Sequence, residues 1–238
     1  GNFRDYDVER DHDLHLSLFA PIVRREYGWT AANIAYSLSL LGVSPSIIAT
    51  AGSDSGEYLE YLKNLGIQTE LIHTIPTSPS LQSIIVHDDS HGQINIFHPG
   101  AMNMSGEISH GNRPFDLAII APDSPKWIVR RMNECKASGI FSIFDPGQAM
   151  GGLTSEELIT LASQADITIM NEPERLRFES MTGQDFIDIC LAHGHTGIVT
   201  LGEKWAYIRS KISENTISGI YVEKVVDATG CGDAFRAG

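Results

Sequence analysis

The chain is organised around the stretch Val226-Asp227-Ala228-Thr229-Gly230-Cys231-Gly232-Asp233-Ala234-Phe235. Gly230 and Gly232 allow the backbone to adopt positive φ and to lie close to a ligand, because neither residue has a Cβ. The apolar run from Ile220 to Val226 predicts a strand before this turn, and residues 234–237 predict a helix after it. Backbone N–H groups at a helix N-terminus attract an anion. The stretch therefore predicts a phosphate-binding turn.

Asp233 places a carboxylate where a phosphate is expected to bind. A carboxylate beside a phosphoryl group can accept the proton of an attacking hydroxyl. The alternative is that Asp233 only caps the helix, a position in which aspartate is common. In an isolated Gly-x-Gly-Asp sequence capping would be the better explanation, so the neighbouring residues decide.

Residues Asp227 to Phe235 resemble the D-[TA]-[TA]-G-[AC]-G-D-[AS]-F signature of the ribokinase (PfkB) family of carbohydrate and nucleoside kinases. The resemblance implies that the N–H groups of Gly230 and Gly232 form an anion hole and that Asp233 is the catalytic base. It also places Asp227, Thr229 and Cys231 beside the nucleotide, near its metal or a monovalent cation.

Composition limits the class of protein. With 238 residues, of which 42% are hydrophobic, the chain can bury a substantial core. The formal charge of −13 argues against a nucleic-acid or anionic-membrane partner, because both require a basic surface. The three cysteines are widely spaced and suggest neither a disulfide framework nor a zinc site, so we expect a reducing, cytoplasmic location. No apolar run approaches the ~20 residues of a membrane span.

From Phe115 onward, short apolar strands alternate with amphipathic helices, which predicts a parallel sheet covered on both faces. The expected strands are 117–121, 140–144 and 167–170, and the expected helices are 125–137 and 155–165. Ligands bind at the carboxyl ends of such strands. The family resemblance implies a ribokinase-like three-layer α/β sandwich with a mostly parallel central sheet flanked by helices, together with a small β-sheet lid.

Polar residues follow two of these strands, and others lie in a further strand and tight turn predicted over residues 198–206. Asp145 resembles the acidic strand end of the family, although a turn role fits equally well. Asn171 and Glu174 match the N-x-x-E motif, which implies that they position Mg²⁺ and phosphate through water; an ordinary helix start is the alternative. Thr200 and Gly202 match the V-T-x-G-x-x-G pattern, which implies that they approach ATP.

The helix predicted over residues 28–42 resembles the acceptor motif G-G-x-x-x-N-x-A-x-x-L-x-x-L-G. By position, the resemblance implies that Gly28 and Asn33 contact the sugar hydroxyls of the acceptor. The alternative for Asn33 is that it is only a polar residue on the exposed face of an amphipathic helix. Gly100 lies in a segment that resembles adenosine-kinase-like members and is expected near the acceptor. Trp29 and Trp205 each replace a glycine of the family motifs.

Residues 81–87 and 93–98 predict a β-hairpin, which fits the lid of the family and is a candidate homodimer contact. Residues 14–19 alternate as in another lid strand, near 13–19. We therefore expect a single α/β domain over 1–238. Its polar start and its abrupt end suggest that terminal segments of the domain are missing.

Together these features predict an ATP-dependent kinase that phosphorylates a primary hydroxyl of a nucleoside. The resemblance to adenosine-kinase-like members implies adenosine as this nucleoside. The alternatives are a kinase of a free sugar such as ribose or fructose, and a catalytically silent regulator that binds nucleotide or nucleoside. Trp29 and Trp205 motivate the regulator, whereas the intact sequence from Gly230 to Asp233 argues against it.

Overall fold

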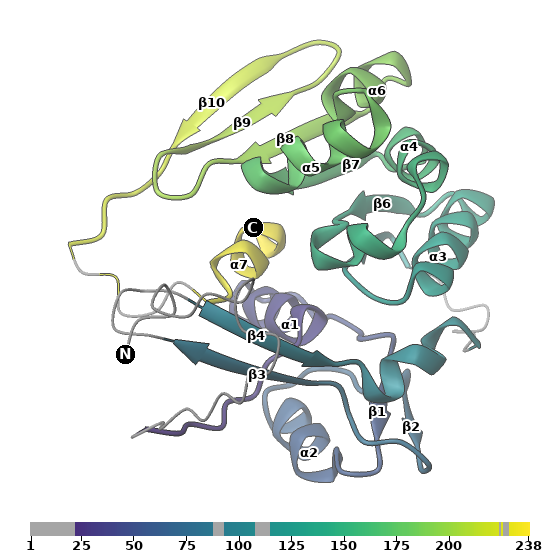
Figure 1. The fold of residues 1–238 in the computed structure, drawn as a ribbon, viewed down its shortest axis with the longest axis vertical. Helices are drawn as coiled ribbons and strands as arrows, with labels where there is room; N and C mark the ends of the chain where they lie inside the picture. The colour runs from purple at the N-terminus through teal and green to yellow at the C-terminus, as the bar shows by residue number, and fades with distance from the viewer. Residues whose placement is uncertain (1–21, 88–92, 108–114, 224, 226–228) are drawn as a thin grey trace, which may run out of the picture.

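The computed structural model describes residues 22–87, 93–107, 115–223, 225 and 229–238. The strand predicted near residues 13–19 lies outside this part of the chain. Figure 1 shows a larger part built around a sheet, a smaller part that carries the β3–β4 hairpin, and the C-terminal helix α7 between them.

A six-stranded sheet forms the centre of the larger part, in the order β10, β9, β8, β7, β6, β5. Strands β5 to β8 are parallel, β9 is antiparallel to β8, and β10 is antiparallel to β9. The predicted mostly parallel sheet is thus confirmed. The strands are β5 (Leu117–Ile120), β6 (Phe141–Phe144), β7 (Ile167–Asn171), β8 (Thr196–Thr200), β9 (Trp205–Arg209) and β10 (Glu214–Ser218).

Helices connect the parallel strands, because a parallel pair requires a long crossover connection. Thr154 is the N-cap of the helix Ser155–Gln164, and its side chain forms a reciprocal capping box with that of Glu157. The helix Pro125–Ser138 is followed by Gly139, which has the left-handed conformation common at helix C-termini. These helices are α3 (Pro125–Ser138), α4 (Ser155–Gln164), α5 (Glu172–Thr182) and α6 (Phe186–Ala192), with a 3₁₀ helix, η3 (Gly147–Gly152), before α4.

The main core lies between this sheet and its helices. Phe178 of α5 and Phe186 of α6 are fully buried and meet edge to face, with ring centroids 6.0 Å apart. Phe144, Met132 and Leu158 belong to the same cluster. The apolar faces that the sequence predicts for α3 and α4 therefore point into the core.

The smaller part contains a second core between two helices and a pair of parallel strands. Its elements are α1 (Thr30–Leu40), β1 (Ala49–Gly52), α2 (Gly56–Asn64) and β2 (Ile72–Ile75). Strands β3 (Gln82–His87) and β4 (Gln93–His98) form the predicted antiparallel hairpin. A 3₁₀ helix, η2 (Gly100–Glu107), follows the hairpin and contacts both β1 and α3.

The register of the parallel strands brings their carboxyl ends together at one edge of the sheet. Asn171, the last residue of β7, pairs with Thr200, the last residue of β8. Asp145 directly follows β6, and its N–H donates to the carbonyl of Ile120 at the end of β5. Residues far apart in the sequence thus line this edge.

The strand predicted over residues 220–226 is wrong for the residues that the structure describes. Residues 220–223 and 225 form no strand, and Ile220 and Tyr221 are 91% and 87% exposed. The physical reason is pairing: none of the described strands pairs with this run, and a strand requires hydrogen bonds from a neighbour. The helix predicted after it is present as α7 (Cys231–Ala237).

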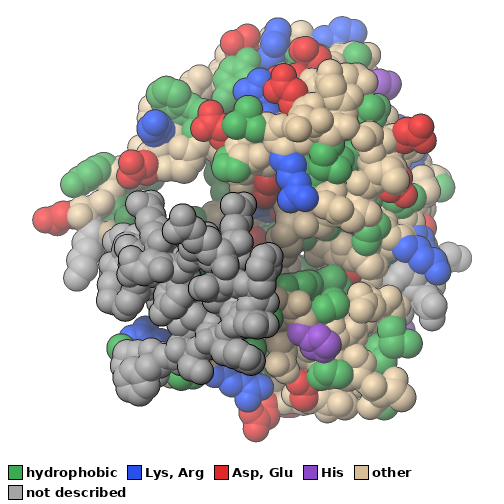
Figure 2. Space-filling view, in the orientation of Figure 1, with side chains coloured by type: hydrophobic (Ala, Val, Ile, Leu, Met, Phe, Trp, Pro, Cys, Tyr) green, Lys and Arg blue, Asp and Glu red, His purple; other side chains and the backbone are tan. Residues whose placement is uncertain are grey.

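Charged side chains of both signs are interspersed over the upper part of the face shown in Figure 2, where Figure 1 places α5, α6 and strands β8 to β10. Within the described ranges, no helix is long and apolar enough to cross a membrane.

Candidate active site

Helices α1 and α7 come from opposite ends of the chain and pack against each other (Figure 1). Asn33 of α1 donates a hydrogen bond from Nδ2 to Oδ2 of Asp233 on α7, at 2.8 Å. The structure therefore brings Asn33, predicted to contact the sugar, into direct contact with Asp233, the predicted base. The alternative, that Asn33 is only a surface polar residue, does not fit this contact.

The turn before α7 has the geometry expected for an anion site. Gly230 has φ 82°, a left-handed conformation that favours glycine. The first intrahelical bond of α7 runs from the N–H of Ala234 to the carbonyl of Gly230, at 2.9 Å. The N–H groups of Cys231, Gly232 and Asp233 precede this bond, so the helix itself supplies no acceptor for them. Binding of phosphate oxygens by these N–H groups stays a prediction.

Asp233 is half-buried, and burial raises the pKa of its carboxyl. The hydrogen bond from Asn33 and the charge of Arg236 lower the pKa and so oppose this effect. No side chain caps the N-terminus of α7, and the hydrogen bond that Asp233 accepts comes from another helix. The capping explanation of Asp233 is therefore not the arrangement found.

Asn171 and Glu174 form the start of helix α5. Asn171 Oδ1 accepts from the N–H of Glu174, and Glu174 Oε2 accepts from the N–H of Asn171, both at 2.8 Å. This reciprocal capping box explains both side chains structurally. Glu174 also lies close enough to raise the pKa of Asp145 through its charge. A role of Glu174 toward Mg²⁺ through water stays a prediction.

Sequence reasoning missed Arg236. Its guanidinium forms an ion pair with Asp145 at the end of β6 and thereby joins α7 to the strand edge. Burial raises the pKa of Asp145 to about 6, whereas the charge of Arg236 lowers it. The signal available in the sequence was a cation three residues after the predicted base, on the same predicted helix.

Gly28 and Trp29 precede α1 in a cluster of aromatic rings. Trp29 is the only non-glycine residue of the described chain with positive φ, at 77°, a backbone conformation that favours glycine. Its ring meets that of Tyr58 edge to face at 5.0 Å, and Tyr58 donates its hydroxyl to the carbonyl of Gly28. The carbonyl of Trp29 accepts from the N–H of Asn33 at 2.9 Å, which places Asn33 in the first turn of α1.

Gly100 and Gly202 have positive φ, at 51° and 65°. A Cβ on Gly100 would lie 2.4 Å from the carbonyl oxygen of Pro79, so close backbone packing already explains this glycine. Gly202 lies in the turn after β8, where the N–H of Leu201 donates to the carbonyl of Trp205 at 2.9 Å. The side chain of Trp205 is 45% exposed. Contacts of Gly100 and Gly202 with substrate or nucleotide stay predictions.

Two residues predicted to lie near the nucleotide are Asp227 and Thr229, and the structure describes only the second. Asp227 lies outside the described residues, whereas Thr229 is described and exposed, directly before Gly230. Among the described residues, no group of three or more His, Cys, Asp or Glu side chains could hold a metal. Mg²⁺ in phosphotransferases is commonly held by one or two carboxylates together with substrate phosphates and waters, so it needs no such cage.

A carboxylate beside a glycine-rich helix N-terminus, above the carboxyl ends of parallel strands, defines a class of α/β phosphotransferases. The family model of the pfkB family carbohydrate kinases matches residues 8–238. The chain belongs to this family.

Comparison with individual proteins gives the same family. The chain is 29% identical to a nucleoside kinase of Methanocaldococcus jannaschii over 235 residues, which cover 98% of this chain and 77% of the relative. The structure of Burkholderia thailandensis nucleoside kinase in complex with inosine matches with TM-score 0.89 and 35% identity, over 93% of this chain and 75% of that one. The structure of the M. jannaschii nucleoside kinase matches with TM-score 0.88 and 28% identity, over 95% and 76%.

The positive φ of Trp29 predicts that truncation to glycine destabilises the protein less than truncation to alanine, the reverse of the usual order. Trp29→Gly and Trp29→Ala both remove the indole, but only alanine retains a Cβ that is strained at this φ. We expect the glycine variant to have the higher free energy of unfolding, by about 1 kcal/mol, in urea denaturation. A more stable alanine variant would show that the backbone relaxes when the ring is absent.

A matched pair of caps separates structure from function at Asn171. Asn171→Ala and Thr154→Ala each remove an N-cap with a capping box and should each lower the free energy of unfolding by about 1 kcal/mol. Only Asn171→Ala should also lower kcat/KM of the kinase reaction, measured by ADP release at a temperature where both variants are folded. Equal activity of the two variants would restrict Asn171 to its role in the helix start.

Proposed function

We propose that this protein is an ATP-dependent nucleoside kinase that transfers the γ-phosphate to a primary hydroxyl of the ribose moiety, with adenosine as its acceptor. The observation that carries the proposal is the 2.8 Å hydrogen bond from Asn33 to Asp233 beside the N-terminus of α7. It places an amide suited to sugar hydroxyls next to a carboxylate suited to accept a proton. Relatives named nucleoside kinases support the same class of acceptor.

Asp233 would take the proton of the attacking hydroxyl as the new oxygen–phosphorus bond forms and the bond from the γ-phosphorus to the β-phosphate oxygen breaks, which releases ADP. The N–H groups of Gly230 to Asp233 would stabilise charge on the transferred phosphoryl, and one such donor is typically worth on the order of 10²-fold in turnover. Such a reaction requires positioning and electrostatic stabilisation rather than a covalent intermediate on the protein.

ATP and Mg²⁺ fit the residues at the strand edge. The open N–H groups of the first turn of α7 suit phosphate, and Thr200, Gly202 and Asn171 lie at the carboxyl ends of β7 and β8, where the nucleotide is expected. When bound, Mg²⁺ would neutralise charge on the phosphates, with Glu174 holding it through water. Asp227 and Thr229 would face a monovalent cation or the metal, with Cys231 beside them.

On the acceptor side, Asn33 and Gly28 would hold the sugar hydroxyls, with Gly100 near the lid. A free sugar such as ribose or fructose is the competing acceptor, and relatives named fructokinases match at 24–25% identity. A silent regulator fits less well, because a protein that only binds nucleotide does not need a half-buried carboxylate in the first turn of α7.

The decisive experiment is ADP release with Mg-ATP across adenosine, inosine, other nucleosides, ribose and fructose. We expect turnover with a nucleoside in the wild type and in Asp188→Asn, an exposed aspartate of α6 that serves as control, and its loss in Asp233→Asn. Because burial raises the pKa of Asp233, activity should decline on the acid side at a higher pH than for an ordinary aspartate. Wild-type turnover in Asp233→Asn would remove the base assignment.

Absence of turnover with every acceptor, from folded protein that binds ATP by calorimetry, would instead favour the regulator. Turnover with ribose or fructose alone would move the proposal to a free-sugar kinase. Each result thus selects one of the three candidate functions.

We also propose that the β3–β4 hairpin acts as a lid and forms a homodimer contact. Ile84 and Ile96 face each other across the hairpin and are 57% and 58% exposed. An isolated two-stranded ribbon is marginally stable in water, so cover from a second copy would stabilise it.

Light scattering should therefore give a dimer for the wild type and a monomer for Ile96→Lys. Ile217→Lys, on the exposed edge strand β10, is the matched control and should remain a dimer. A monomeric wild type at micromolar concentration would remove the homodimer proposal.

A further inference from the structure

A buried ion pair connects helix α7 to the central sheet. Arg236 contacts Oδ2 of Asp145 through Nε, and the two side chains are only 10% and 1% exposed. The other carboxylate oxygen of Asp145 is buried and has no hydrogen-bond partner among the described residues. Removing one partner of such a pair leaves an uncompensated charge in the interior.

The guanidinium of Arg236 also packs against the anion turn itself. A Cβ built on Gly232 would lie 2.6 Å from Nη1 of Arg236. Gly232 is not among the glycines with positive φ, so its backbone conformation does not by itself call for glycine. A side chain at this position would instead meet the guanidinium of Arg236, which would have to move away.

Charges from several elements meet at this point. Asp233 faces Arg236 of its own helix and the amide of Asn33 from α1. Asp145, which follows β6, is influenced by Arg236, by Glu174 of α5 and by Asp233. Arg236 is thus the cation that acts on both aspartates, and it lies on the same helix as the predicted base.

We propose that Arg236, held by Asp145, is a positioning residue for phosphoryl transfer that fixes the anion turn over the strand edge and holds Asp233 beside the acceptor. This inference rests on the proposed kinase function. Asp145 acts through Arg236 and has no direct part in the reaction.

The kinetic test compares Arg236→Gln, Arg236→Lys and Asp145→Asn. We expect Arg236→Gln to lower kcat by about 10²-fold, since small misplacements of reacting groups have effects of this size. The acid limb of its pH profile for kcat/KM should move to higher pH, because the cation that lowers the pKa of Asp233 is gone. Asp145→Asn should lower kcat by releasing Arg236, and Arg236→Lys should restore the pH profile in part because it keeps the charge.

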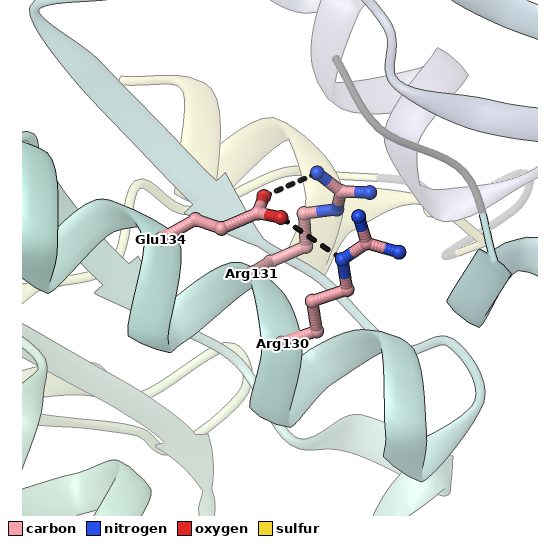
Figure 3. Close-up of polar contacts among 3 residues, drawn as sticks. All are labelled: Arg130, Arg131 and Glu134. Carbon is pink, nitrogen blue, oxygen red and sulfur yellow. Dashed lines mark hydrogen bonds and ion pairs between the residues drawn. The ribbon is translucent and has the colours of Figure 1, made fainter. Parts of the chain in front are cut away.

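The control is another buried arginine paired with a carboxylate. Arg131 of α3 forms an ion pair with Glu134, which also binds Arg130 through Nε at 2.9 Å (Figure 3). Arg131→Gln should lower the melting temperature but leave kcat within about twofold and the pH profile unchanged, because its helix does not carry the anion turn. If Arg236→Gln behaves in the same way as Arg131→Gln, the Arg236–Asp145 pair is structural only and the inference is wrong.

A measurement without turnover separates this inference from the proposed function. A ¹³C NMR titration of the Asp233 carboxyl should show a higher pKa in Arg236→Gln than in the wild type, and an intermediate pKa in Arg236→Lys. An unchanged titration would overturn the inference even in an active kinase. If the pKa of Asp233 differs between the wild type and Arg236→Gln as expected, but the wild type phosphorylates no acceptor, the proposed function is overturned instead.

Discussion

The parallel arrangement of β5 to β8 is the constraint on which the site depends. Parallel strands end at the same edge, so residues that directly follow them gather there whatever their distance along the chain. Asp145 and the paired ends Asn171 and Thr200 occupy this edge. Helix α7 is joined to it by Arg236, and α1 is joined to α7 by Asn33. The acceptor side of the site, on α1, and the phosphate side, on α7, are thus both held at the carboxyl ends of the same parallel strands.

Periodicity and short motifs were sufficient to predict the parallel strands, helices α3 and α4, the β3–β4 hairpin and helix α7. These features follow from local patterns: apolar alternation, capping residues and glycines at turns. The family resemblance assigned Asn33 and Asp233 to one active site, which no local pattern could supply, and the hydrogen bond between them was found only in the structure. The run from Ile220 to Tyr221 shows the limit, because an apolar sequence forms a strand only where a neighbour offers hydrogen bonds.

Contacts between distant side chains could not be predicted from the sequence. Arg236 reads as an ordinary cation on a helix until the structure brings Asp145 to it. Asn171 and Glu174 show another case, because the sequence left open a ligand role and a helix start, and the structure shows that they form a complete helix cap. The positive φ of Trp29 is likewise visible only in the structure. A residue type therefore indicates a role, and its partners decide it.

The hydrogen bond from Asn33 to Asp233 joins residues 200 positions apart. Closing a loop of that length has an entropic cost that must be met before the contact contributes anything, so such contacts form late in folding. On the ribosome, domains fold as the chain emerges, and α1 has to wait for α7. We therefore expect the contact between Asn33 and Asp233 to be among the last parts of the molecule to form, with enzymatic activity appearing only after the sheet has assembled.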